Sequence, residues 1–159
     1  MSDPAALPES TALRIVRRIL LLALWLGIGG TALELLLLEH HEEWTQIIPL
    51  GLLAAGLLAL IWHAVHRSAA PLRAIQLLMV LFAVAGATGL VLHYRGNAEF
   101  ELEMYPSKAG WELFRESMMG ATPALAPGTM IQLAMIGLAY SYRHPRLRRD
   151  AEVTDRRHA

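Results

Sequence analysis

The chain has 159 residues, of which 55% are hydrophobic, and its mean hydropathy is +0.38. A water-soluble domain of this size cannot bury so much apolar surface, so the composition indicates an integral membrane protein. The 14 basic and 14 acidic residues cancel, which argues against nucleic acid as a partner, and the absence of cysteine excludes disulfides, thiolate metal sites and iron–sulfur clusters.

Four apolar segments approach the length of a membrane span. A helix needs roughly 20 apolar residues to cross a hydrocarbon core about 30 Å thick, and the candidate spans are residues 19–38, 47–65, 74–92 and 124–142. A cleaved signal peptide is the competing interpretation of the first, but its apolar run continues through Leu38, past the small residues "GGTA" where cleavage would fall. The sequence therefore predicts an all-α membrane protein with four transmembrane helices in an up-down bundle.

The fourth span is the least regular of the four. "TMIQLAMIGLAYSY" covers only residues 129–142 unless the preceding "ATPALAP" is included. Pro123 and Pro127 suit either a helix start or a kink, and the sequence leaves that choice open. No repeat or low-complexity linker divides the chain. We expect one membrane domain at 19–142, an N-terminal tail at 1–18 and a basic C-terminal tail at 143–159.

The charges beside the spans predict their direction, because basic residues are retained on the cytoplasmic side. If the N-terminus is inside, eight of the 14 acids lie outside and only Arg95, Lys108 and Arg115 face out with them. Eleven basic residues then lie inside: Arg14, Arg17, Arg18, Arg67, Arg73, Arg143, Arg146, Arg148, Arg149, Arg156 and Arg157. Both termini are predicted to be cytoplasmic. The preference for arginine over lysine suggests a bacterial plasma (inner) membrane protein.

The longest segment outside the spans is residues 93–123, which we expect to be a structured outer loop. Within it, "SKAGWELFRESMMG" predicts a short helix with Trp111, Phe114 and Met118 on one side. Such a helix would lie in the outer headgroup layer or form a lid over the bundle. "EFELEM" alternates acidic and apolar residues, which is typical of an extended segment with one wet face.

Histidines and glutamates gather at the outer ends of the predicted spans. Imidazole and carboxylate groups suit a divalent transition metal, although no Glu-x-x-His or His-Glu-x-x-His motif is present. The candidate metal ligands are Glu39, His40, His41, Glu43 and His93. A haem is a further alternative, with His41 and His93 at the outer edge or His63, His66 and His144 at the inner one, but no two histidines lie deep in facing spans. A solvated, acidic exit from the membrane is the competing interpretation.

Glu34 lies four residues before Leu38, about 6 Å inside the predicted outer boundary. A carboxylate at that depth must pair, reach the interface or become protonated. Thr88 and Gln132 fall near the same depth, so the three are predicted to form an intramembrane polar layer. Its role would be interhelical hydrogen bonding or a ligand or proton-coupled site.

Catalytic motifs are absent: the chain has no phosphate-binding loop, nucleophile elbow or dinucleotide fingerprint. We therefore expect a non-enzymatic structural or accessory membrane subunit without a cofactor. Its partners would be the lipid bilayer and a membrane protein or a second copy of itself, contacted through helix faces and the acidic outer loop. A metal- or haem-binding redox protein and a site at Glu34 remain the alternatives.

Overall fold

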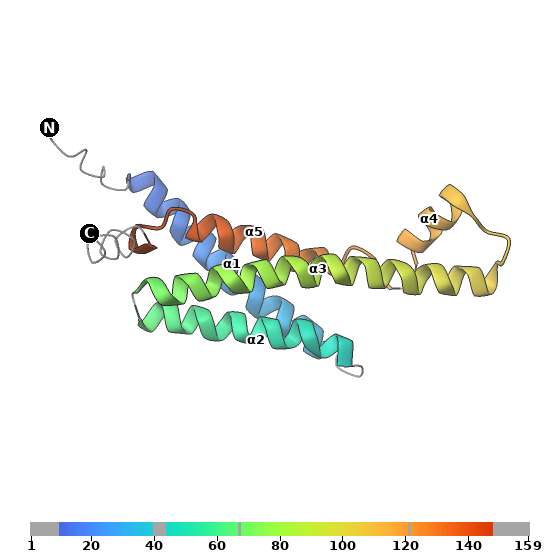
Figure 1. The fold of residues 1–159 in the computed structure, drawn as a ribbon, viewed down its shortest axis with the longest axis horizontal. Helices are drawn as coiled ribbons and strands as arrows, with labels where there is room; N and C mark the ends of the chain where they lie inside the picture. Colours follow the sequence, from blue (N-terminus) through green and yellow to red (C-terminus); the bar gives the residue numbers. More distant parts are fainter. Residues whose placement is uncertain (1–9, 40–43, 67, 121, 148–159) are drawn as a thin grey trace, which may run out of the picture.

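The computed structural model describes residues 10–39, 44–66, 68–120 and 122–147, and these contain five α-helices and no strand (Figure 1). The helices are α1 (Thr11–Leu37), α2 (Trp44–Val65), α3 (Ala69–Met104), α4 (Gly110–Met118) and α5 (Gly128–Ser141). The α1 helix begins after Ser10, whose hydroxyl accepts a hydrogen bond from the Leu13 amide at 3.2 Å. The all-helical prediction is confirmed for the described residues.

Three helices, α1, α2 and α3, are long and apolar enough to cross a membrane. The α5 helix has 14 residues and so a length of about 21 Å. It begins only at Gly128, because the preceding residues form tight turns in which the Ala126 and Gly128 amides donate to the carbonyls of Pro123 and Leu125. Pro127 caps α5, so among the described residues the proline precedes the helix and does not kink it.

The α3 helix continues well beyond its predicted span. Its 36 residues extend through "EFELEM", so the extended conformation expected there is wrong. Alternation over six residues is a weak signal, and alanine, glutamate, leucine and methionine all favour helix. The far end of α3 projects past the other long helices, where α4 packs against it (Figure 1).

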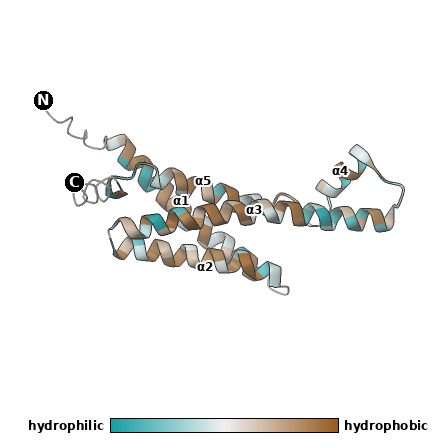
Figure 2. Ribbon diagram, viewed as in Figure 1, coloured by the Kyte–Doolittle hydropathy of each residue, from teal (hydrophilic) through white to brown (hydrophobic). Residues whose placement is uncertain are grey.

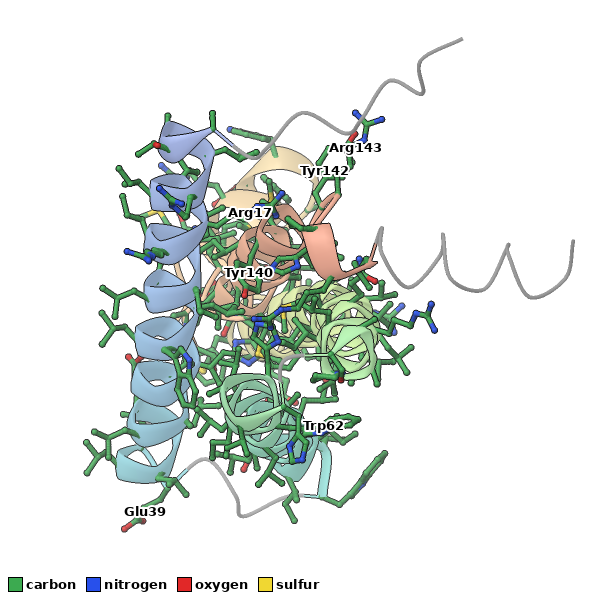
Figure 3. The ribbon with its side chains drawn as sticks, turned by 90° about the vertical axis from the view of Figure 1, so that its left-hand side faces the viewer. Arg17, Glu39, Trp62, Tyr140, Tyr142 and Arg143 are labelled. Carbon is green, nitrogen blue, oxygen red and sulfur yellow. The ribbon has the colours of Figure 1, made fainter. Side chains whose placement is uncertain are left out.

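An apolar core lies among α1, α2, α3 and α5. The α1 and α3 helices each pack on both α2 and α5, and α1 crosses the others obliquely, as a comparison of Figures 1 and 3 shows. The buried cluster combines side chains from all four helices: Leu24, Ile28, Leu53, Ala59, Leu60, Ile75, Met79, Phe82, Met130, Leu133 and Ala134.

The outward faces of these helices are as apolar as the core. Leu26, Leu58, Leu77 and Met135, one from each helix, are all more than 60% exposed, and Figure 2 shows hydrophobic colouring along most of α2, the middle of α3 and α5. A helix that is apolar on its exposed side is stable in lipid but not in water. This distribution fits a membrane-embedded protein.

Glycines let α3 and α5 approach closely. A Cβ atom on Gly86 would lie 2.8 Å from Ile131 Cγ1 and 2.9 Å from the Pro127 carbonyl oxygen. In membranes, where lipid is as apolar as leucine, such close backbone packing contributes much of the attraction between helices. The absence of a side chain at Gly86 therefore lets the start of α5 pack closely against the middle of α3.

The charges of the described residues separate between the two ends of the molecule. We call one the arginine end; its charged residues are Arg14, Arg17, Arg18, Arg73, Arg143 and Arg146. The start of α1, the α2–α3 connection and the end of α5 all lie there (Figure 1). We call the other the acidic end; its acids are Glu34, Glu39, Glu99, Glu101, Glu103, Glu112 and Glu116. Every acid that the structure describes belongs to the second group.

Candidate functional site

A buried polar cluster at the arginine end joins α1, α2 and α5. Arg17 is only 9% exposed, and its guanidinium donates to the carbonyls of Tyr140 at 2.7 Å, Tyr142 at 3.1 Å and Arg143 at 3.3 Å. These carbonyls lie at the end of α5, where a helix lacks its own donors and carries partial negative charge. Figure 3 looks toward this end and shows the four residues together. Arg17 therefore neutralises the end of α5 and ties it to α1.

The chain leaves α5 through a turn whose conformation Arg17 supports. The His144 amide donates to the Ser141 carbonyl at 3.1 Å, Tyr142 has φ −58° and ψ 122°, and Arg143 has φ 46°. A positive φ is unfavourable for arginine, because its Cβ crowds the backbone. The hydrogen bond from Arg17 to the Arg143 carbonyl helps hold this conformation.

Two histidines and a tyrosine meet beneath this turn. His63 of α2 is 5% exposed, and its Nε2 lies 2.6 Å from the Tyr140 hydroxyl. The His144 ring lies 6.1 Å from the His63 ring and 5.6 Å from the Tyr140 ring, measured between centroids. The Arg146 amide donates to His144 Nδ1 at 3.3 Å. The cluster thus links α2 to α5 and to the segment after it.

His63 Nδ1 is buried and has no hydrogen-bond partner among the described residues. Buried acceptors are left unpaired more often than buried donors, which favours the tautomer in which Nε2–H donates to the Tyr140 oxygen. No carboxylate that the structure describes lies at this end, and the arginines disfavour a bound cation. The arrangement is suited to joining helices.

A second polar cluster fixes the hairpin formed by the outer part of α3 and by α4. Asn97 is 5% exposed. Its Nδ2 donates to the carbonyls of Ser117 at 2.9 Å and Thr122 at 2.7 Å, while its Oδ1 accepts from the Thr122 amide at 3.2 Å. The Asn97 amide and the Ser117 carbonyl are buried, and a buried polar group without a partner costs about 1–3 kcal/mol. Asn97 therefore determines how α4 and the following segment return to α3.

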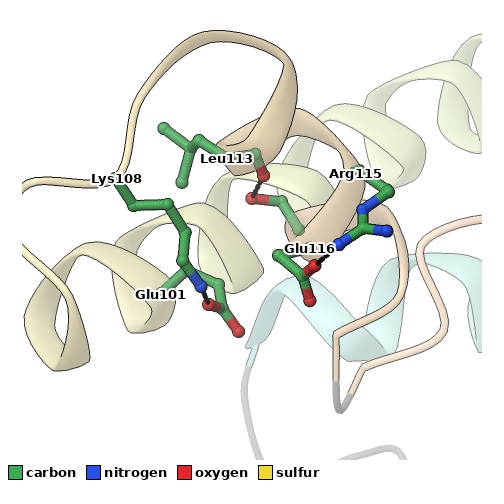
Figure 4. A network of polar contacts seen from close by, with 6 residues as sticks. Glu101, Lys108, Leu113, Arg115 and Glu116 are labelled. Atoms are coloured by element: carbon green, nitrogen blue, oxygen red, sulfur yellow. Dashed lines mark hydrogen bonds and ion pairs between the residues drawn. The ribbon is translucent and has the colours of Figure 1, made fainter.

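Contacts nearer the tip complete this hairpin. Lys108 Nζ lies 2.5 Å from Glu101 Oε2 and 4.3 Å from the Tyr105 ring centroid, and the Ser117 hydroxyl donates to the Leu113 carbonyl (Figure 4). The hydrogen bond from Lys108 to Glu101 raises the pKa of the lysine above its ordinary value. On α4 the Phe114 ring stacks on Trp111 with centroids 5.2 Å apart, and it also contacts Tyr94 of α3 in a tilted arrangement with centroids 5.8 Å apart.

Large apolar side chains nevertheless remain exposed on this hairpin. Trp111 is 75% exposed, and the other exposed members are Phe100, Leu102, Met104, Tyr105, Phe114 and Met119. Glu99, Glu103 and Glu112 are exposed on the same two helices. An apolar surface with acidic residues beside it can bind either a lipid headgroup layer or another protein. We call this surface the hairpin face.

All three residues of the predicted polar layer are exposed in the structure. Glu34 on α1, Thr88 on α3 and Gln132 on α5 are exposed, and α1 packs on α2 and α5, whereas its contacts in the described part of the chain do not include α3. The structure does not bring these three side chains together in the interior. Any partners they have lie beyond the packed core of the described residues.

The predicted metal ligands are only partly described. Glu39 is exposed and follows α1 with φ 52°, and His93 Nδ1 donates to the Pro123 carbonyl at 3.0 Å. His40, His41 and Glu43 lie outside the described residues. Within the described ranges no three histidine, aspartate or glutamate side chains are placed to hold a metal. A site that includes the remaining ligands stays a prediction.

Sequence reasoning missed the roles of Arg17 and Asn97. Arg17 was counted only among the residues that set orientation, yet it lies seven and eleven residues before Leu24 and Ile28, on the face that is buried. Asn97 is the only asparagine of the chain and lies four and eleven residues after His93 and Gly86. Because these helices are apolar on their exposed sides as well, helical spacing alone does not mark the buried side, and the sequence carries no signal for either role.

Comparisons with protein-family models, curated proteins and solved structures find no match.

Proposed function

We propose that the chain is a four-span protein of a bacterial plasma membrane, with both termini cytoplasmic, and that it acts as an accessory subunit without catalytic activity of its own. The α5 helix with the turns before it makes the fourth crossing of an up-down bundle. Six of the nine basic residues that the structure describes lie at the arginine end, which supports this orientation, because basic residues are retained on the cytoplasmic side. The acidic end then faces out.

The observation that carries the proposed role is the hairpin at the acidic end. The α3 helix is about 54 Å long, whereas a hydrocarbon core is about 30 Å thick, so its far end and α4 project from the membrane. The hydrogen bonds of Asn97 and Lys108 hold the hairpin in one arrangement. Trp111 is the most exposed of the large apolar side chains that the structure describes on it. A fixed surface with an aromatic centre and an acidic border is suited to a membrane-protein partner with an apolar pocket and a basic rim.

Photo-crosslinking in intact membranes tests this role. A photoreactive residue at position 111 should give one discrete protein adduct, which is lost when the exposed Phe100 is also changed to alanine. The matched control carries the same group at position 58, on the lipid-facing side of α2, and should give lipid adducts. If position 111 yields only lipid adducts, the hairpin face is an interfacial anchor and the proposed role is wrong.

The redox alternative has a simple test. A metal or haem at full occupancy would appear in the metal content and visible spectrum of the purified protein. Retention of a metal that disappears with His41→Ala and His93→Ala would favour that alternative over the accessory role.

A further inference from the structure

Two arginines on α1 form a surface of like charge, and none of the acids that the structure describes lies at this end of the molecule. Arg14 and Arg18 are exposed and four residues apart, so they share a side of the helix with a rise of about 6 Å between them. Neither makes a salt bridge within the part of the chain that the structure describes; Arg14 only approaches the Thr11 hydroxyl at 3.5 Å. Like charges at this spacing destabilise a helix, so the pair favours a bound anion.

Arg17 is not part of this exposed surface. It lies between Arg14 and Arg18 in sequence, but its side chain points into the protein and bonds to the backbone around Arg143. Arg143 is also exposed, but Arg17 contacts its backbone carbonyl and not its side chain. The exposed cations of this surface are therefore Arg14 and Arg18, which flank a buried arginine in the sequence.

The surface beside these arginines is apolar and continues toward the middle of the molecule. Leu22 and Leu26 follow Arg18 at intervals of four residues and are 59% and 67% exposed. Trp25, seven residues after Arg18, lies on the same side and is half-buried. A ligand that fits must therefore carry an anionic head and an apolar chain about 10 Å or more in length.

We propose that Arg14 and Arg18 bind the phosphate headgroup of an anionic phospholipid, whose acyl chain lies along Leu22, Trp25 and Leu26. The guanidinium groups match phosphate oxygens in pairs, and the leucines supply the contact that free phosphate cannot use. This site lies at the end of the molecule opposite the hairpin face and does not depend on the proposed accessory role.

Fluorescence quenching of the full chain in zwitterionic detergent micelles tests the proposal. Phosphatidylglycerol with brominated acyl chains should quench Trp25 saturably, and Trp25→Phe should remove that component. Each arginine near an anionic surface contributes about fivefold in affinity, so Arg14→Gln with Arg18→Gln should weaken binding by about 25-fold. The matched control, Arg95→Gln with Arg115→Gln, removes the same charge at the acidic end and should change binding less than twofold.

Three outcomes would overturn this site. They are equal quenching by brominated phosphatidylcholine, an unchanged affinity in the double variant, and complete displacement of the lipid by millimolar inorganic phosphate, which would mean a simple ion site. Melting temperatures in micelles without anionic lipid show whether the variants fold. If the double variant does not fold, the two single variants should each weaken binding by about fivefold.

Discussion

Arg17 donates a 2.7 Å hydrogen bond to the backbone carbonyl of Tyr140, across 123 positions of sequence. The first helix thereby supplies the donor that the end of α5 lacks. Tyr140 in turn contacts His63 on α2 through its hydroxyl. The Arg17 and Tyr140 side chains thus connect α1, α2 and α5 at the arginine end. Without these contacts the end of the short α5 helix would be held less firmly.

Replacement of Arg17 by lysine should destabilise this end although the charge is kept. An ammonium group cannot match three carbonyls with the planar arrangement of guanidinium donors, and hydrogen bonds to charged groups contribute about 1.5–3 kcal/mol each. We expect Arg17→Lys to lower the free energy of unfolding in micelles by about 2 kcal/mol. Arg18→Lys, at an exposed position, should change it by less than about 0.5 kcal/mol. If both changes lower the free energy of unfolding equally, the charge of Arg17 and not its hydrogen-bond geometry stabilises this end.

Two glycine substitutions should have opposite effects. Alanine at Gly86 would place its Cβ against the Pro127 carbonyl oxygen and Ile131, and overpacking costs about 1–3 kcal/mol. Alanine at Gly51 meets nothing within 4 Å and should raise stability by up to about 1 kcal/mol through helix propensity. Thermal unfolding of both variants measures the difference, and a stabilised Gly86→Ala protein would contradict the close packing of α3 and α5.

Asn97→Ala should loosen the hairpin and leave the core intact. The substitution removes three hydrogen bonds and leaves the buried Ser117 carbonyl without that donor, at a cost of about 2–3 kcal/mol. Amide exchange in residues 105–120 should rise at least tenfold, while exchange in the middle of α2 stays unchanged. Glu99→Ala, two residues away and exposed, serves as the control and should not alter exchange.

The Lys108–Glu101 pair gives the hairpin a pH dependence. Because the hydrogen bond to Glu101 raises the lysine pKa in the folded state, the pair stabilises the hairpin below the ordinary lysine pKa, and that contribution is lost as pH rises through the raised value. Nitrogen chemical shifts of Lys108 Nζ should show this titration. Glu101→Gln should return the pKa toward its ordinary value, and an unchanged titration would mean that the pair does not persist in solution.

The apolar runs predicted α1 to α3 well, because a membrane helix needs only length and hydrophobicity. The end of α3 was missed at "EFELEM", where six alternating residues fitted a strand although most of them favour helix, and where α4 packs against the helix. The start of α5 depends on turns around Pro123 and Pro127, which local sequence left open. Glu34 was assigned to an intramembrane polar layer by its depth alone, but depth does not determine which side of a helix meets a neighbour. That choice depends on packing, which here turns Arg17 inward and leaves Glu34 exposed.

Labelling of single cysteines tests the four-span arrangement most directly, since the natural chain has none. Ser68→Cys, Glu103→Cys and Leu147→Cys report on the α2–α3 connection, the hairpin and the segment after α5. A membrane-impermeant maleimide should label only Glu103→Cys in intact spheroplasts and should label the other two after permeabilisation. Labelling of Leu147→Cys from outside while Ser68→Cys stays protected would contradict a fourth crossing, and labelling of Ser68→Cys from outside would reverse the orientation.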